Sequence, residues 1–314
     1  MPFPVESNKL IQQAASNKER NCMAYDNYDL FSHVDEHLTR PKFRAPRAKN
    51  FYPSEASVTS YDEHGDKVVH GGCMRAAYFR CSGHEFERIP NTARSEYIFK
   101  QGIGVEKILI DLWKEMGIWV DNNVKFVDAE AGISGELDAL LMEPDGTVYG
   151  AEVKSFYGYF AEKELFGNRS TKAFPKMPHL LQTLIYLNFF KDKLPYFRIV
   201  YFARDSVKRR TFKVELHEEG DIIYPKVEGE VIRSFTVNDI YARYEELQSY
   251  LDNDIVPPND YELYYSRDKI EDYFKKGKVA KTKYAKWQAG KLGPHEQIGD
   301  WNCSYCAFKN ICWS

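Results

Sequence analysis

The segment that most constrains the fold lies between residues 135 and 155, GELDALLMEPDGTVYGAEVKS. Its centre, Pro144-Asp145-Gly146, is a strong turn signal between two strand-like runs. If these residues form the loop of an antiparallel hairpin, directly opposed residues have numbers that sum to 290, because 143 faces 147. Asp138 and Glu152 then lie opposite each other, with Cβ atoms roughly 5 Å apart. Lys154, two residues beyond Glu152, points to the same face of the hairpin.

This arrangement of charges indicates a metal site. Two carboxylates held this close repel each other unless a cation lies between them. Mg²⁺ and Mn²⁺ are hard cations that take oxygen ligands at about 2.1 Å, and such a metal polarises a phosphate and lowers the pKa of a bound water. Lys154 can orient that water or stabilise charge on the phosphate, and the Val153 carbonyl is a further candidate ligand. The alternative is a surface hairpin with solvated charges, since D…ExK spacings are common by chance.

The segments around the hairpin predict an α/β fold, with a mixed central sheet flanked by helices. Apolar residues at helical spacing predict a largely buried helix over 95–117, and Glu106 on it is a third candidate acidic ligand or an exposed helix residue. The other expected elements are a helix opening at 71–81, strands over 118–156, a helix over 177–190, strands over 197–203 and 210–216, and a helix over 236–252.

The helix expected over 177–190 carries a second group of polar residues. Gln182 and Tyr186 are four residues apart and therefore share one helical face, with His179 one turn earlier. A glutamine and a tyrosine beside a metal can grip a phosphate or a base. The alternative is an amphipathic helix whose polar residues have no such role.

Three cysteines close to the end of the sequence form a C-x2-C-x5-C pattern: Cys303, Cys306 and Cys312. Three thiolates need a fourth ligand, for which Cys73 is the best candidate and Cys81 the second. Thiolates bind Zn²⁺ and build iron–sulfur clusters, and both remain open from the spacing alone. Free structural cysteines are the alternative, but clustered cysteines in a reducing cytosol favour a metal or redox role.

Residues 267–287 interleave basic and aromatic side chains, a pattern that suits phosphates and stacked bases. A solvated basic helix is the alternative. The net charge of −3 neither demands nor excludes a nucleic-acid partner. No apolar run approaches the roughly 18 residues that span a bilayer, and MPFPVESNKL lacks the layout of a secretory signal. We therefore expect a cytoplasmic protein without a membrane partner.

Taken together, these residues resemble the RecB-like branch of the PD-(D/E)XK nucleases. The branch has G-x-x-D, E-x-K and Q-x-x-x-Y motifs in that order, and this chain has Gly135 to Asp138, Glu152 to Lys154 and Gln182 to Tyr186. The resemblance implies a restriction-endonuclease-like core and a Mg²⁺- or Mn²⁺-dependent DNA exonuclease. In the roles it implies, the metal ligands are Glu106, Asp138, Glu152 and Val153, Lys154 positions the attacking water, and Gln182 and Tyr186 contact DNA or brace Lys154.

The iron–sulfur members of the branch, such as the CRISPR-associated exonucleases and the AddB-type nuclease domains, carry one cysteine before the core and three after it. By this resemblance, Cys73, Cys303, Cys306 and Cys312 hold a structural 4Fe-4S cluster. Single-stranded DNA ends, attacked 5′ to 3′, are the expected substrate. Recombination, repair or CRISPR-adaptation proteins are the expected partners. A non-catalytic DNA-binding or assembly subunit and a zinc-stapled endonuclease are the rival interpretations.

Two features depart from the family pattern. The CRISPR-associated members usually have histidine as the first metal ligand, where this chain has Glu106, and the stretch 259–300 is longer than expected. We predict an N-terminal extension over residues 1–70, a nuclease core over 71–258, and a basic insertion with the cysteine segment over 259–314.

Overall fold

The structure, a computed structural model of the whole chain, describes residues 29–40, 50–62, 65–84, 92–169, 171–293 and 297–313. The chain divides into two compact units. The first comprises residues 1–42 and 90–96, and its described part contains α2 (Leu30–Thr39) and the first turn of α4 (Ala93–Glu115). The second comprises residues 43–89 and 97–314. Of the extension predicted over residues 1–70, positions 1–28, 41–49 and 63–64 lie outside the described residues.

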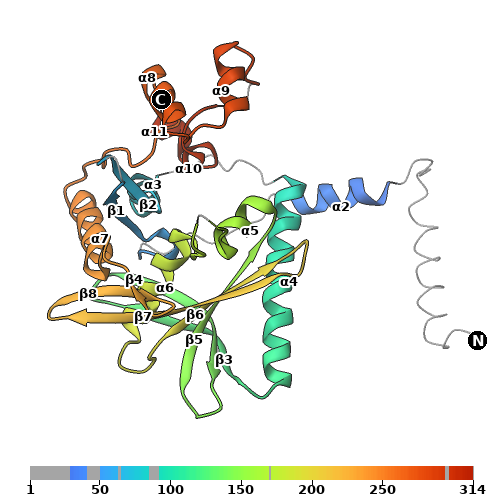
Figure 1. Cartoon of the computed structure of the whole chain (residues 1–314), viewed down its shortest axis with the longest axis vertical. Helices are drawn as coiled ribbons and strands as arrows, with labels where there is room; N and C mark the ends of the chain where they lie inside the picture. Colours follow the sequence, from blue (N-terminus) through green and yellow to red (C-terminus); the bar gives the residue numbers. More distant parts are fainter. Residues whose placement is uncertain are drawn as a thin grey trace, which may run out of the picture. The chain divides into compact units, whose positions relative to one another are not determined.

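The second unit is built on a seven-stranded sheet with the order β3-β4-β5-β6-β7-β8-β9 (Figure 1). Its strands are β3 (Trp119–Asp128), β4 (Ile133–Met142), β5 (Val148–Phe156), β6 (Phe197–Ala203), β7 (Arg209–Glu219), β8 (Ile222–Val227) and β9 (Glu230–Val231). β5 and β6 run parallel, whereas the other neighbours pair antiparallel. The predicted class, a mixed sheet flanked by helices, is therefore confirmed, although β8 and β9 were not foreseen.

The parallel pair requires a crossover connection, which α5 (Tyr159–Phe166) and α6 (Met177–Phe189) supply. α6 is the most buried helix segment of this connection, because Leu180, Leu181, Leu184 and Ile185 are all fully buried. They join the main hydrophobic core, which includes Ile199 on β6. The helix predicted over 177–190 is thus confirmed and covers one face of the sheet.

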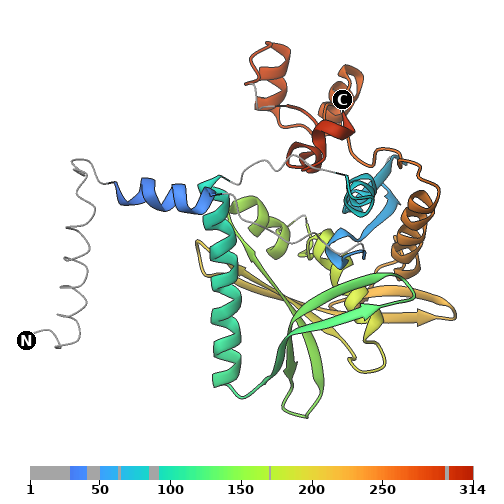
Figure 2. The ribbon, with the colours of Figure 1, turned by 180° about the vertical axis from the view of Figure 1, so that it is seen from behind.

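α4 packs on the opposite face, where Val105 and Leu109 contact Val153 of β5 in one small cluster. Both views show the helix running alongside the sheet (Figures 1 and 2). The prediction of a largely buried helix was wrong. Apolar side chains surround much of its circumference, and the sheet covers only one side, so Ile103 and Met116 are each 66% exposed.

A two-stranded hairpin, β1 (Ser57–Tyr61) and β2 (Lys67–Gly71), lies outside the main sheet and packs against α6. The contact is close at Gly71, whose φ is +96°. A Cβ atom there would lie 2.1 Å from the Ala56 carbonyl oxygen and 2.9 Å from Leu181 Cδ1. Only glycine fits this position, because it combines a left-handed backbone with contact on two sides.

The chain also contains seven further elements in the described part of the second unit. They are η1 (Pro53–Glu55), α3 (Met74–Cys81), α7 (Val237–Asp252), α8 (Arg267–Lys275), α9 (Lys281–Gln288), α10 (Trp301–Ser304) and α11 (Lys309–Cys312). α7 begins at a capping box in which Thr236 and Asp239 exchange hydrogen bonds. None of the helices in the described ranges is both long and apolar enough to cross a membrane.

Candidate functional site

The predicted hairpin register is confirmed as far as Ala139, but the predicted strand pairing of Asp138 with Glu152 does not form. Ala139 faces Ala151 and Met142 faces Val148, and both pairs sum to 290 as the Pro-Asp-Gly loop requires. The pairing of β4 with β5 ends at Ala139–Ala151, while β4 continues beside β3 and β5 continues beside β6. The two strands therefore separate at the level of Asp138 and Glu152, and the carboxylates lie where the sheet forks.

Asp138 compensates for the strand pairing lost at this fork. Its Oδ2 accepts a hydrogen bond of 2.7 Å from the backbone N–H of Val153. The carboxylate thus occupies the position where an antiparallel neighbour would offer a carbonyl. In an extended strand the N–H and C=O of one residue point to the same side, so the Val153 carbonyl also points toward the fork.

Glu152 is the most deeply buried charged group of the site, with 1% of the residue exposed. Its Oε1 accepts a 2.6 Å hydrogen bond from Lys154 Nζ, whereas its Oε2 is buried without a hydrogen-bond partner in the described structure. Burial, reinforced by the charge of Asp138, raises the pKa of Glu152 to about 8. Such an unsatisfied carboxylate oxygen costs free energy, and a cation would relieve it.

Glu106 and Asp138 belong to the same electrostatic cluster. Burial and then the negative charge of Asp138 raise the pKa of Glu106. Burial also raises the pKa of Asp138, against the opposing effect of Lys154. Burial lowers the pKa of Lys154, but the charges of Glu152 and Asp138 outweigh it and raise that pKa overall. Three carboxylates and one ammonium therefore influence one another electrostatically.

Gln182 and Tyr186 lie on the same side of α6 and are linked by a hydrogen bond. Gln182 Nε2 donates to the Tyr186 hydroxyl at 2.8 Å, and that hydroxyl donates to the Glu136 carbonyl at 3.1 Å. In the described part of the chain, neither side chain hydrogen-bonds to Lys154. The pair holds the backbone of β4 two residues before Asp138, a role in positioning the site that the sequence did not indicate.

His179 and Tyr201 extend the site beyond the predicted residues. His179 Nδ1 lies 2.9 Å from the Tyr201 hydroxyl, and Tyr201 is the strand neighbour of Lys154 across the parallel pair. Burial, then the charges of Lys154 and Lys176, lower the pKa of His179 to about 3. The alternating burial of FRIVYFA identifies Tyr201 as an inward residue, but its partner comes from a different element.

No group of three or more His, Cys, Asp or Glu side chains in the described part of the chain is placed closely enough to hold a metal ion as it stands. The fit of the fork to a divalent cation rests instead on its donor chemistry. It offers hard oxygen donors, an unsatisfied buried Glu152 oxygen and raised carboxyl pKa values.

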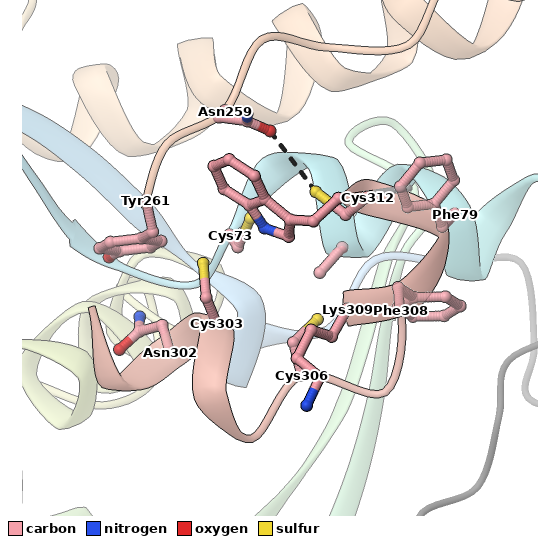
Figure 3. Close-up of a pocket in the computed structure, with 12 residues that line it drawn as sticks. Cys73, Phe79, Asn259, Tyr261, Asn302, Cys303, Cys306, Phe308, Lys309 and Cys312 are labelled. Atoms are coloured by element: carbon pink, nitrogen blue, oxygen red, sulfur yellow. Dashed lines mark hydrogen bonds between the residues drawn. The ribbon is translucent and has the colours of Figure 1, made fainter. Parts of the chain in front are cut away.

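The cysteines form a second site, where four of them line one small cavity of about 20 Å³ (Figure 3). Cys73 is the N-cap residue of α3, Cys303 lies in α10, Cys306 follows that helix, and Cys312 ends α11. The walls between them are mainly aromatic, with Phe79, Phe308 and Trp313. Segments 230 residues apart in the sequence (73 and 303) therefore meet here.

Burial raises the pKa of Cys73 to about 12 and that of Cys303 to about 11. The charge of Cys306 is a smaller cause that also raises both pKa values. Cys312 Sγ also contacts Asn259 Oδ1 at 3.5 Å (Figure 3). Cys81, the second candidate for fourth ligand, does not line the cavity and lies buried near Arg80 and Glu55.

No family model matches the chain. No curated protein matches it either. Solved structures do match, and one of them is described as the crystal structure of SSO0001. This chain is 14% identical to it, the match covers 90% of this chain and 93% of the other, and the TM-score is 0.39. A match this distant does not establish a shared fold or function.

Proposed function

We propose that this protein is a metal-dependent DNA exonuclease that hydrolyses phosphodiester bonds. The observation that carries the proposal is the fork between β4 and β5, which brings Asp138, Glu152 and Lys154 together at one buried point. A stable fold gains nothing from an unsatisfied buried carboxylate oxygen such as Glu152 Oε2. Unfavourable buried charges of this kind are typical of functional sites.

In the proposed site, Glu106, Asp138, Glu152 and the Val153 carbonyl hold Mg²⁺ or Mn²⁺. When bound, the metal would polarise the scissile phosphate and lower the pKa of a water. The Lys154 ammonium, held by Glu152 at 2.6 Å, orients that water and balances negative charge on the phosphate. Tyr186, through the Glu136 carbonyl, keeps the β4 backbone beside Asp138 in place.

The proposed substrate is single-stranded DNA, entered from an end and degraded 5′ to 3′. The resemblance to RecB-like nucleases supports this choice, together with the basic and aromatic residues over 267–287. The proposal also includes a cytoplasmic location and a role beside recombination, repair or CRISPR-adaptation proteins.

The proposed activity is tested with end-labelled single-stranded DNA in Mn²⁺. Wild-type protein should release nucleotides or short fragments, and Asp138→Asn should lower the rate by a factor on the order of 10² or more, because it removes a ligand charge while keeping the shape. Asp145→Asn is the matched control, since it removes an acid from the exposed loop of the same hairpin. Equal degradation by wild type and Asp138→Asn would refute the site. DNA binding without hydrolysis by wild type would favour a non-catalytic subunit.

We further propose that Cys73, Cys303, Cys306 and Cys312 hold a 4Fe-4S cluster. Four thiols on one aromatic-walled cavity supply the donor set and the water-poor surroundings that such clusters use. The role would be structural, since it ties α3 to the segment 301–313. Fixing such a long loop removes chain entropy from the unfolded state.

One observation favours a zinc ion as the alternative. The cavity volume of about 20 Å³ is little more than the space of one water, so a cluster requires the cysteine side chains to turn outward. Protein purified without oxygen should be brown, with broad absorption near about 400 nm and about four iron atoms per chain. Cys303→Ser should lose the iron, whereas Cys81→Ser should retain it. A colourless protein with stoichiometric zinc would establish the alternative.

A further inference from the structure

A second cavity, of about 630 Å³, lies between the β1–β2 hairpin and the segment that carries α8 and α9. Its volume falls within the range of about 300–1,000 Å³ that is typical of ligand pockets. Neither the candidate metal ligands nor the candidate cluster cysteines line it. Residues that contribute from both sides include Ser60, Tyr61, His70, Tyr273, Lys278 and Lys283.

The acidic residues of this cavity are already engaged with the protein. Asp300 accepts a hydrogen bond of 2.6 Å from the Tyr265 hydroxyl, and Asp62 accepts one of 2.6 Å from Lys278 Nζ. The contact between Lys278 and Asp62 fastens the α8–α9 segment to the hairpin. Asp62 is therefore neutralised by Lys278, whereas Asp300 is held by hydrogen bonds from the Tyr265 hydroxyl and the Glu262 N–H.

On the basic side of the cavity, one lysine has no ion-pair partner in the part of the chain that the structure describes. From 273 to 293 the sequence has no Asp or Glu but has seven lysines, at 275, 276, 278, 281, 283, 286 and 291. Lys276 and Lys278 pair with acids of the β1–β2 hairpin. Lys283 lines the cavity, and among the described residues it has no ion-pair partner. A cation in this setting favours an anionic ligand.

An exposed aromatic ring lines the same cavity. Tyr61, the last residue of β1, lines the cavity and is 73% exposed. A flat, accessible ring is a platform on which a nucleobase can stack, and a lysine nearby is a typical phosphate contact. An aromatic platform with a lysine that has no ion-pair partner among the described residues is a combination found in grooves that bind single-stranded nucleic acid.

We propose that this cavity binds a nucleotide of single-stranded DNA at a distance from the carboxylates, with the base on Tyr61 and a phosphate on Lys283. The proposal deepens the proposed function and depends on it for the identity of the ligand. The β1–β2 hairpin also packs on α6, the helix that carries Gln182 and Tyr186. A DNA strand bound at the hairpin would therefore contact the same compact unit that contains the candidate active site.

The test measures the affinity of the whole protein for a fluorescent oligodeoxythymidine of about 20 nucleotides, by anisotropy in EDTA. Lys283→Glu should weaken binding roughly tenfold and make the slope of log K against log[salt] shallower by about 0.7, the value for one phosphate contact on a single strand. Lys193→Glu is the charge-matched control, because Lys193 is exposed and does not line the cavity. It should leave both quantities near their wild-type values.

The aromatic contact is tested separately. Tyr61→Ala should weaken binding between about 5-fold and 100-fold, whereas Tyr61→Phe, which keeps the ring, should bind like wild type. Tyr61 is exposed, so neither substitution should disturb folding. Wild-type affinity in both Lys283→Glu and Tyr61→Ala would overturn the proposal, as would a wild-type protein that does not bind the oligonucleotide.

Binding in EDTA does not depend on hydrolysis, so this test is separable from that of the nuclease. Weakened binding in Lys283→Glu, with no hydrolysis by wild type in Mn²⁺, would support DNA binding at the cavity and refute the nuclease activity. Unchanged binding in that variant, with hydrolysis that Asp138→Asn abolishes, would support the nuclease activity and refute DNA binding at the cavity.

Discussion

Asp138 and Val153 are joined across the fork of the sheet by a 2.7 Å hydrogen bond from a backbone N–H to a carboxylate. The bond fixes one candidate ligand to the strand that carries the next, Glu152. It therefore holds two carboxylates together against their mutual repulsion, before any cation neutralises them. A site prepared in this way should bind a divalent ion with little rearrangement.

The first prediction is that Mn²⁺ stabilises the folded protein through this site. A ligand that binds only the folded state adds RT ln(1 + [L]/Kd), about 2.7 kcal/mol at 100 times Kd. The melting temperature of wild type should rise with Mn²⁺ concentration, and that of Asp138→Asn should rise much less. Asp145→Asn should behave like wild type. A rise of equal size in all three proteins would assign the stabilisation to another site.

The second prediction concerns Tyr186, whose hydroxyl lies between Gln182 and the Glu136 carbonyl. Tyr186→Phe removes two part-buried hydrogen bonds, one from the Gln182 amide and one to the Glu136 carbonyl, so the free energy of unfolding should fall by about 1–3 kcal/mol. Tyr264→Phe, at a tyrosine that is 63% exposed, should change it little. Urea denaturation measures both. If Tyr186 only contacts DNA, its substitution should weaken DNA binding and leave stability unchanged.

Local chemistry explains why the carboxylate hairpin was predictable. A Pro-Asp-Gly turn between strands with a period of two residues leaves one register, and that register pairs Ala139 with Ala151, the neighbours of Asp138 and Glu152. The fork was not predictable, because β4 leaves β5 to remain with β3, and this depends on the whole sheet. The hydrogen bond from Val153 to Asp138 exists only because of the fork.

Contacts between distant elements were not predictable for the same reason. The apolar pattern of α4 does not say that the sheet covers only the Val105 and Leu109 side. Similarly, Cys73 and Cys81 are both cysteines of one short helical segment, and spacing alone does not choose between them. The choice follows from where the C-terminal cysteines dock, beside the N-terminus of α3.

The third prediction concerns the buried ion pair that anchors the N-terminus of α3. Asp260 accepts hydrogen bonds from Arg243 Nη2 at 2.8 Å and from the Met74 N–H at 2.7 Å, next to Cys73. Its side chain is 8% exposed. Asp260→Ala leaves the buried Arg243 charge with only the longer contact of 3.4 Å to the more exposed Glu246, so the free energy of unfolding should fall by up to about 3–5 kcal/mol.

The matched control for this pair is Glu219→Ala, which breaks the exposed pair with Arg233. Solvent screens that pair, so no measurable loss is expected. Urea denaturation of the three proteins at one pH gives the comparison. Equal stability of Asp260→Ala and Glu219→Ala would show that the buried pair does not anchor the helix.

The fourth prediction is a loss of stability at mildly acidic pH that originates at His179. The Tyr201 hydroxyl accepts a hydrogen bond of 3.0 Å from the backbone N–H of Lys176, so its own proton can be donated to His179 Nδ1. Only a neutral imidazole can accept a hydrogen bond at Nδ1. Burial and the nearby lysines lower the pKa of His179 to about 3, from 6.5. Between these values the unfolded chain binds a proton that the folded chain does not, so this stabilisation is complete above pH 6.5 and decreases as the pH falls.

At about pH 5 the resulting loss from this group is about 2 kcal/mol. His179→Gln has no proton to bind here, so its free energy of unfolding should fall less between about pH 7.5 and pH 5, by up to that amount. Urea denaturation at both pH values measures the difference, and the imidazole resonances of His179 report its titration directly. An equal fall in wild type and His179→Gln, or a His179 that titrates near 6.5 in the folded protein, would contradict a neutral, buried imidazole beside Lys154.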